Sequence, residues 1–251
     1  MRRSVGVDLA VNARTTAVAE IRWDGDGDGA AAGVPVTGCR DEYLLDLLSG
    51  LGEGEAAGVD CPFGWPIAFA EAVAAHADHR PWPGHADREG HYRDMRLRMT
   101  DRVTDAALRP LTGRGPLSVS MDKLGATAAR WAHLAHHLAE RGHPVDRAGA
   151  GRVVEVYPAG SRAVWGLTGA RSTGALVGVM PWLRFEPGAQ AAYERNEHAF
   201  DALIAALTAR CAVLGLTSRP GGAEEEGAAA VEGWIHLPAA DAPARLAPGR
   251  S

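Results

Sequence analysis

The sequence predicts an α/β protein built on a mixed β-sheet. Residues 4–10 and 15–23 have the alternating pattern of two strands joined by a short turn, and residues 33–38 form a third predicted strand. Apolar residues between 43 and 51 then recur with helical spacing, and another apolar strand follows at 57–61. A helical crossover brings the chain back parallel to a strand already in the sheet. This order of elements therefore predicts antiparallel first strands and a fourth strand that lies parallel to a neighbour.

The rest of the chain is predicted to hold three more helices and two short strands. The helices are expected at 65–76, 121–141 and 189–215, the strands at 152–156 and 231–237, a hairpin turn at 24–29 and a loop at 217–229. Residues 78–120 show no clear periodicity, and a segment of that length is typical of a substrate loop or lid. We therefore expect one domain over residues 1–238, with residues 78–120 as an irregular insertion and residues 239–251 as a flexible tail.

The composition restricts the function classes. The chain has 251 residues, 46% of them hydrophobic, so it can form a sizeable core. A net charge of −5 excludes a protein that coats duplex nucleic acid through bulk positive charge, but a small, local nucleic-acid contact is compatible with it. The three cysteines match no zinc motif and favour a reducing compartment. With no signal-peptide pattern and no apolar run of membrane-spanning length, we expect a cytoplasmic protein without a membrane partner.

Two acidic residues stand in strands that are otherwise apolar. Asp8 follows Val5 and Val7 in the first strand, and Asp60 ends the strand at 57–61 just before Pro62. A carboxylate in such a strand is costly unless something pairs with it, and two carboxylates brought together repel unless one is protonated or a cation lies between them. One interpretation is that each aspartate caps a neighbouring loop. The repetition of the pattern favours a shared carboxylate site.

Two further acids extend this set. Glu155 lies in the strand at 152–156, and Asp201 lies at the border of the apolar stripe of the helix at 189–215, where Glu197 and His198 share its environment. Carboxylate oxygens are the ligands that Mg²⁺ and Mn²⁺ prefer. Two such ions about 4 Å apart can hold the attacking water and the leaving oxygen of a phosphodiester. The pattern therefore predicts that Asp8, Asp60, Glu155 and Asp201 bind two divalent ions and carry catalysis.

The chain also resembles a known family, the domain-of-unknown-function family 429, whose members are described as predicted nucleases with a fold like that of RNase H. The resemblance lies in six segments that occur in family order up to about residue 238. They are Gly6-Val7-Asp8-Leu9-Ala10, Gly58-Val59-Asp60-Cys61-Pro62-Phe63-Gly64, Arg98-Met99-Thr100-Asp101, Glu155-Val156-Tyr157-Pro158-Ala159, His198-Ala199-Phe200-Asp201-Ala202-Leu203 and Glu232-Gly233-Trp234-Ile235.

The resemblance implies an RNase H-like, mixed five-stranded sheet flanked by helices, with strands 1–3 antiparallel and strand 4 parallel to strand 1. It also implies that Asp8, Asp60 and Asp201 hold the metal ions, while the position of the remaining acid, which would be Glu155, varies among RNase H-like enzymes. The expected activity is a divalent-metal-dependent nuclease that hydrolyses phosphodiester bonds of a nucleic-acid substrate by a two-metal mechanism.

Several polar residues are candidates for substrate contact. Arg98, Asp101 and Arg102 belong to an arginine-rich part of the 78–120 segment, and arginine binds phosphate in a bidentate manner. A solvated loop with local Arg–Asp pairs is the competing interpretation. His198 and Glu232 complete the expected substrate-binding set, and a surface position for Glu232 is equally compatible with its pattern.

Two alternative functions share the same opening motif. Gly6 to Ala10, followed by Thr15 and Thr16, resembles the first phosphate loop of actin-like ATPases and sugar kinases, although Ala10 stands where that loop has glycine and the chain is short for a duplicated core. A non-catalytic nucleic-acid-binding module on the same scaffold is the second alternative. His133, His136 and His137 have a spacing that suits a pair of metal ligands, but a solvated helix face is the expected arrangement.

Overall fold

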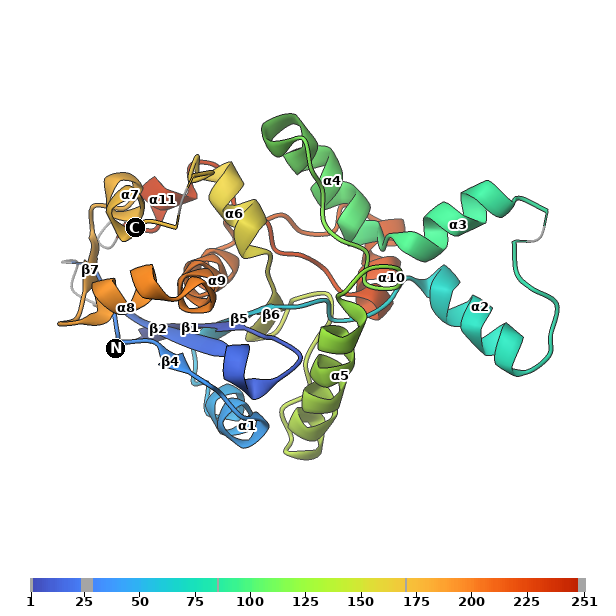
Figure 1. Ribbon diagram of the computed structural model, residues 1–251, viewed down its shortest axis with the longest axis horizontal. Coiled ribbons are helices and arrows are strands. Elements are labelled where there is room, and N and C mark those ends of the chain that lie inside the picture. Colours follow the sequence, from blue (N-terminus) through green and yellow to red (C-terminus); the bar gives the residue numbers. More distant parts are fainter. Residues whose placement is uncertain (1, 24–28, 85, 170, 248–251) are drawn as a thin grey trace.

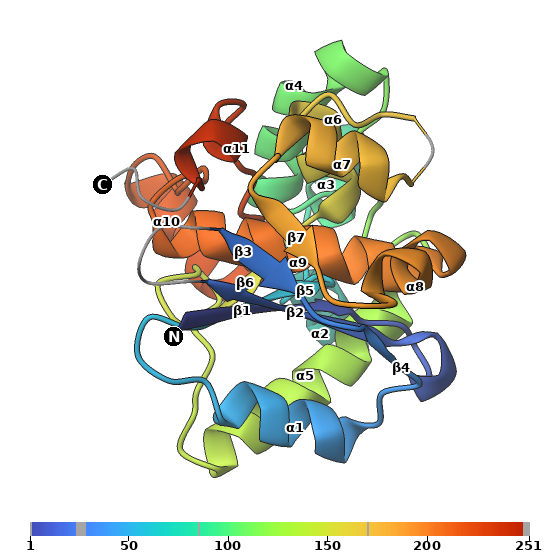
Figure 2. The ribbon, with the colours of Figure 1, turned by 90° about the vertical axis from the view of Figure 1, so that its left-hand side faces the viewer.

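A mixed β-sheet with helices on both faces forms the centre of the molecule (Figures 1 and 2). The computed structural model describes residues 2–23, 29–84, 86–169 and 171–247. Within these ranges the sheet has seven strands in the order β6-β5-β1-β2-β3-β7, with β4 also paired to β2. The strands are β1 (Arg2–Asp8), β2 (Ala17–Trp23), β3 (Ala30–Ala32), β4 (Val36–Thr37), β5 (Ala56–Asp60), β6 (Val153–Glu155) and β7 (Leu183–Phe185).

The pairing of the central strands agrees with the predicted chain order. Strand β2 is antiparallel to both β1 and β3, whereas β5 lies parallel to β1 and β6 lies parallel to β5. The expected count of five strands is wrong, because β4 and β7 extend the sheet. The third strand also lies at 30–32 instead of 33–38, and only residues 36–37 of the predicted segment pair with β2. Most of the turn predicted at 24–29 lies outside the described residues.

Helices cover both faces of the sheet. The first face carries α1 (Asp41–Ser49) and α5 (Gly125–Glu140), and the second carries α9 (Glu197–Val213) (Figure 2). The remaining helices are α2 (Ile67–Ala77), α3 (Arg88–Arg96), α4 (Met99–Thr112), α6 (Pro158–Val164), α7 (Thr173–Val179), α8 (Ala189–Arg195), α10 (Ala223–Glu232) and α11 (Ala242–Arg245), and residues 13–15 form a short 3₁₀ turn. In Figure 1, α2 and α3 project from the body as a helical arm.

Strand alternation decides which side chains meet which helices. Val5 and Val7 point to the first face and pack in one core cluster with Leu44 of α1 and Trp131 of α5. Gly6 points to the second face, where a Cβ atom would lie 1.8 Å from the carbonyl oxygen of Ala202. The missing side chain therefore lets α9 lie directly on the sheet, and residues of the first turns of α9 come close to the end of β1.

Several segments differ from the sequence-based prediction. The 78–120 segment contains α3 and α4 instead of being irregular throughout, and the predicted helix at 189–215 is two helices. The break falls at Asn196, whose side chain accepts hydrogen bonds from the backbone of His198 and Ala199 and so caps α9. Residues 223–232 form α10 instead of loop and strand, and Ile235 makes only an isolated bridge to Glu155.

The segment after residue 238 also packs against the core. Within the predicted tail, α11 forms, and the side chains of Ala242 and Leu246 are buried with the residues of α9 and β7. The expectation of a flexible tail from residue 239 therefore does not describe residues 242–246. In the described residues, no helix is both long and apolar enough to cross a lipid bilayer.

Candidate functional site

Two aspartates lie side by side at the end of the central parallel strands. Asp8 and Asp60 are register partners in the β1–β5 pair, and each is the last residue of its strand. They share the face of Gly6 and Gly58, because side chains two positions apart in a strand point the same way. This is the face that α9 covers, and neither position is fully buried. The sequence-based prediction that the two strands bring their acids together thus agrees with the structure.

The first turns of α9 add a histidine and a third acid. The Nδ1 atom of His198 lies 2.6 Å from Oδ2 of Asp8. One turn later, Asp201 forms an ion pair with Arg171, whose Nε lies 3.2 Å from both carboxylate oxygens. Arg162 of α6 approaches the same carboxylate at 3.9 Å. Both arginines lie outside the set predicted from the sequence, because nothing in their local sequence pattern connects them to Asp201.

Burial, together with repulsion between carboxylates, raises the pKa of the paired aspartates. Burial is the main cause of a raised pKa of about 6 for Asp8; the repulsion of Asp201 adds to it, and His198 opposes it. Asp60 has a pKa well above its usual value, because desolvation at this partly buried position is reinforced by the repulsion of Asp8, Asp201 and Glu155. Within the described residues, no hydrogen bond or ion pair reaches the Asp60 carboxylate. The site therefore carries more negative charge than its own cations balance.

Glu155 has a different environment from the other three acids. It is 2% exposed, and Arg98 donates to both of its oxygens, from Nη1 to Oε2 at 2.9 Å and from Nη2 to Oε1 at 2.7 Å. The backbone N–H of Phe63 donates to Oε2 as well. Gly233 leaves the space for this arrangement, because a Cβ atom there would lie 2.6 Å from Oε2. All of these contacts hold Glu155 in place beside the aspartate pair, and none points to a substrate.

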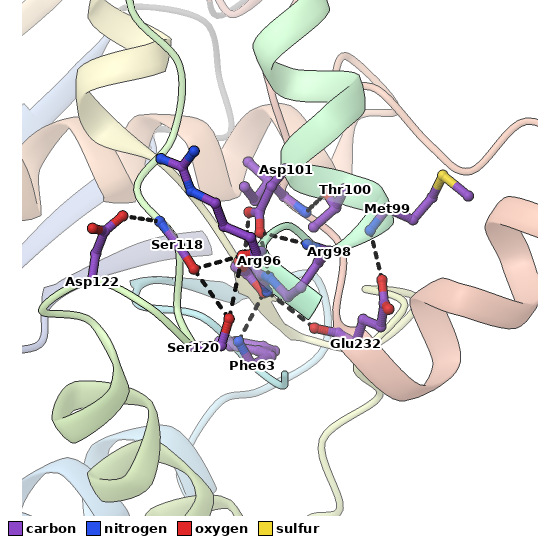
Figure 3. Close-up of polar contacts among 12 residues, drawn as sticks. Phe63, Arg96, Arg98, Met99, Thr100, Asp101, Ser118, Ser120, Asp122 and Glu232 are labelled. Atoms are coloured by element: carbon purple, nitrogen blue, oxygen red, sulfur yellow. Dashed lines mark hydrogen bonds and ion pairs between the residues drawn. The ribbon is translucent and has the colours of Figure 1, made fainter. Parts of the chain in front are cut away.

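Arg98 is also buried and fully engaged. Its remaining N–H groups bond to both oxygens of Asp101 and to the backbone carbonyl of Glu232, so all five guanidinium donors have partners (Figure 3). The backbone N–H of Arg98 donates to Asp101 too, which completes a cap at the start of α4. Arg98 is 2% exposed. The structure therefore leaves no donor of Arg98 available for the phosphate contact expected from the sequence.

Two other predicted substrate residues, Glu232 and Arg102, have partners away from the aspartate pair. The carboxylate of Glu232 accepts hydrogen bonds from the backbone N–H groups of Ile67 and Met99, and it thereby ties α10 to the first turns of α2 and α4 (Figure 3). Arg102 is partly exposed and pairs with Asp94 of α3 at 2.9 Å. Of the expected substrate-binding set, His198 touches Asp8 and Arg98 touches Glu155, so two of its members contact predicted metal ligands.

A cavity of about 250 Å³ opens beside the aspartates. Its lining includes Asp8 and Asp60, Pro116 and Leu117 from the loop before α5, and Tyr157 after β6. Burial and the charge of Asp60 raise the pKa of Tyr157, so the phenol stays protonated at neutral pH. The cavity gives a small molecule or part of a polymer access to the aspartate pair.

The residues at this edge suit a hard divalent cation. In the ranges that the structure describes, no three acidic, histidine or cysteine side chains lie close enough together to enclose a metal ion. The paired carboxylates of Asp8 and Asp60 are nevertheless the ligand type that Mg²⁺ prefers, and Mg²⁺ commonly takes only one or two carboxylates and keeps its other ligands as water. A bound cation would offset the repulsion among the carboxylates, which contributes to the raised pKa of Asp60.

The comparison with family models places the chain in a family. A model described as "Protein of unknown function (DUF429)" matches residues 6–225, a range that includes Asp8, Asp60, Glu155 and Asp201. Neither a curated protein nor a solved structure gives a significant match. Since the match covers most of the sequence, the chain belongs to the DUF429 family.

Proposed function

We propose that this protein is a divalent-metal-dependent nuclease, a hydrolase of phosphodiester bonds in nucleic acid, on an RNase H-like scaffold. One observation carries the proposal: Asp8 and Asp60 are register partners at the ends of two parallel strands, face the same helix and lack sufficient cationic partners. The antiparallel strands β1 to β3 and the parallel strand β5 beside β1 support the scaffold assignment.

In this proposal Asp8, Asp60 and Asp201 hold Mg²⁺ or Mn²⁺. When bound, such ions activate a water molecule and stabilise the leaving oxygen of the phosphodiester. The contacts of Asp201 mean that Arg171 has to give up its ion pair before the carboxylate can serve as a ligand. Glu155 takes a supporting role, because Arg98 and Phe63 occupy its oxygens and hold β6 next to Asp60.

Two cationic groups that lie against Asp201 suit a negatively charged substrate. Arg171 has an exposed fraction of 36% and lies against Asp201, while Arg162 lies deeper and has no partner for its Nε within the described residues. Arginine recognises phosphate through two parallel hydrogen bonds. We assign both arginines to contacts with the phosphate groups that flank the scissile bond, in the place that the sequence pattern assigned to Arg98. His198 orients Asp8 through the contact at its Nδ1 atom.

The decisive test is an activity screen on labelled single-stranded, duplex, hybrid and branched nucleic acids with Mg²⁺ or Mn²⁺. We expect cleavage by the wild type and loss of most turnover in Asp60→Asn, while substrate affinity largely survives. Asp46→Asn is the matched control, because Asp46 is an exposed aspartate whose ion-pair partner within the described ranges is Arg141 on the surface. Cleavage that persists in the Asp8→Asn/Asp60→Asn double variant would refute the mechanism. A wild type that hydrolyses ATP but cleaves no nucleic acid would favour an actin-like phosphotransferase.

A further inference from the structure

Helix α5 carries a cluster of polar side chains on its solvent-facing side. The opposite side of the helix packs into the core through Trp131, Leu134 and Leu138, each 1% exposed. The spacing of three and four residues places the polar members on adjacent turns of one face. The cluster consists of His133, His136, His137 and Glu140.

Two of the imidazole rings already converge. The Nε2 atoms of His133 and His137 are 3.2 Å apart, and the rings lie at 87° to each other. The other ring nitrogen of His137, Nδ1, is 2.8 Å from Oε2 of Glu140. With the Nδ1 proton donated to this carboxylate, the Nε2 atom of His137 carries a lone pair directed toward His133.

This separation matches that of two nitrogens bound to one metal ion. Zn–N bonds of about 2.0–2.1 Å and nitrogens 3.2 Å apart require a ligand–metal–ligand angle of about 100°, which lies between the octahedral and tetrahedral values. A carboxylate that accepts from the far nitrogen of a ligating histidine is the usual outer partner in such sites. We infer that His133 and His137 form a binding site for a first-row transition-metal ion such as Zn²⁺, Ni²⁺ or Cu²⁺, with Glu140 orienting His137.

The site differs from the aspartate pair in both chemistry and position. Imidazole nitrogens select Zn²⁺, Ni²⁺ and Cu²⁺, whereas carboxylate oxygens suit Mg²⁺ and Mn²⁺. Thr127 of α5 lines the cavity of the aspartates, and His133 lies six residues further along, which is about 9 Å along the axis and about 120° around the helix. His133 and Glu140 are exposed. The remaining coordination positions are therefore left to water or to a donor from another molecule.

Calorimetric titration of the full chain with Zn²⁺ and Ni²⁺ tests the inference. We expect one ion per chain at the histidine pair and no response of these histidines to Mg²⁺. His133→Ala and His137→Ala should each abolish this binding, and Glu140→Ala should weaken it by roughly tenfold. All three substitutions replace exposed or half-buried polar side chains, so thermal unfolding without metal should be unchanged.

His136→Ala provides the matched control, because His136 contacts the other oxygen of Glu140 at 3.3 Å but is not part of the converging pair. It should bind Zn²⁺ as the wild type does, and so should the Asp8→Asn/Asp60→Asn double variant. Nitrogen NMR shifts of the imidazole rings report directly which Nε2 atoms bind the ion. Wild-type affinity for Zn²⁺ in both His133→Ala and His137→Ala would overturn the inference, as would Zn²⁺ binding that disappears in the double aspartate variant.

Discussion

Arg98 and Glu155 form a buried, bidentate ion pair that joins the start of α4 to β6, with two nitrogen–oxygen distances of 2.9 and 2.7 Å. Asp101 binds the opposite side of the same guanidinium. One arginine therefore provides the counter-charge for two buried carboxylates next to the candidate site. Its removal leaves both without a counter-charge, and an uncompensated buried charge is far more costly than a missing surface pair.

Arg98→Met should accordingly lower the free energy of unfolding by about 3–5 kcal/mol in urea denaturation. Arg109→Met is the control on the same helix, because Arg109 makes a similar bidentate pair with Asp105 but has an exposed fraction of 63%. That substitution should cost less than about 1 kcal/mol. Equal losses in the two variants would show that the buried pair contributes no special stability.

The raised pKa of Asp8 predicts how stability depends on pH in the absence of metal. Folding raises the pKa from 3.8 to about 6, so the folded state binds the proton more tightly, and this contribution is lost as the pH rises from about 4 to about 6. Asp8→Asn removes the free-energy cost of keeping this desolvated carboxylate ionised above pH 6. It should raise the free energy of unfolding at pH 7 by up to roughly 3 kcal/mol, with Asp46→Asn as the unaffected control. A variant less stable than the wild type at pH 7 without metal would contradict this sign.

His236 should show the opposite pH dependence. Burial, with a smaller effect of Arg219, lowers its pKa from 6.5 to about 4, and within the described residues its Nε2 atom has no partner. Its contribution is therefore fully present above about pH 6.5 and is lost as the pH falls toward about 4.

The size of this effect is up to roughly 3 kcal/mol, measured as the difference between wild type and His236→Asn in urea unfolding at a series of pH values. The comparison with the variant is needed because the titration of Asp8 changes the free energy of unfolding in the opposite direction between about pH 4 and pH 6. His143→Asn, at an exposed histidine, should leave the pH profile unchanged. A His236→Asn profile identical to that of the wild type would contradict the prediction.

Gly6 predicts the sharpest steric effect in the sheet. Its Cβ would lie 1.8 Å from the carbonyl oxygen of Ala202, so Gly6→Ala has to push α9 off β1 at a cost of roughly 3 kcal/mol or more. Gly227→Ala is the control, because Gly227 is an exposed glycine within α10 with open space around it. It should stabilise the protein by about 0.5–1 kcal/mol in thermal or urea unfolding. A tolerated Gly6→Ala would mean that α9 does not lie this close to the sheet.

Arg171→Ala should separate metal binding from substrate binding, provided that the proposed function holds. The substitution frees Asp201 from its ion pair, so the affinity for Mn²⁺ in calorimetry should rise or stay the same. Nucleic-acid affinity should fall, and its salt dependence should become shallower, because one phosphate contact is lost. Arg245→Ala is the control, because Arg245 is exposed and its ion-pair partner among the described residues is Asp241. An unchanged salt dependence would remove Arg171 from the substrate contacts.

Local sequence patterns predicted the two acids and a parallel fourth strand, while the resemblance to the family implied that this strand lies beside the first one. The alternation in residues 4–10 places Asp8 on the face of Gly6, and the helix between β4 and β5 brings the chain back parallel to β1. Asn196 has the side chain of a good helix N-cap, but it lies within the 27-residue pattern that predicts one helix over 189–215. In the structure it ends α8 and caps α9. The helices α3 and α4 are amphipathic, but their buried sides hold few apolar residues. These are Met95 in α3 and Leu108 in α4, which is buried beside Thr100, Asp101 and Thr104, so no apolar stripe indicates either helix in the sequence.

Charge partners were decided only by the tertiary structure. The sequence patterns were compatible with a solvated loop for Arg98 and Asp101 and with a metal site for Glu155. In the structure the start of α4 lies next to β6 and α10, and the three side chains form one buried hydrogen-bonded network. Asp201 likewise meets Arg171, which is 30 residues away in the sequence. Alternation and helical spacing act over a few residues, so a sequence can determine the face on which an acid lies. The cation that pairs with this acid depends on long-range packing. A buried charge is costly without a partner, and that partner comes from a segment that the fold places next to it.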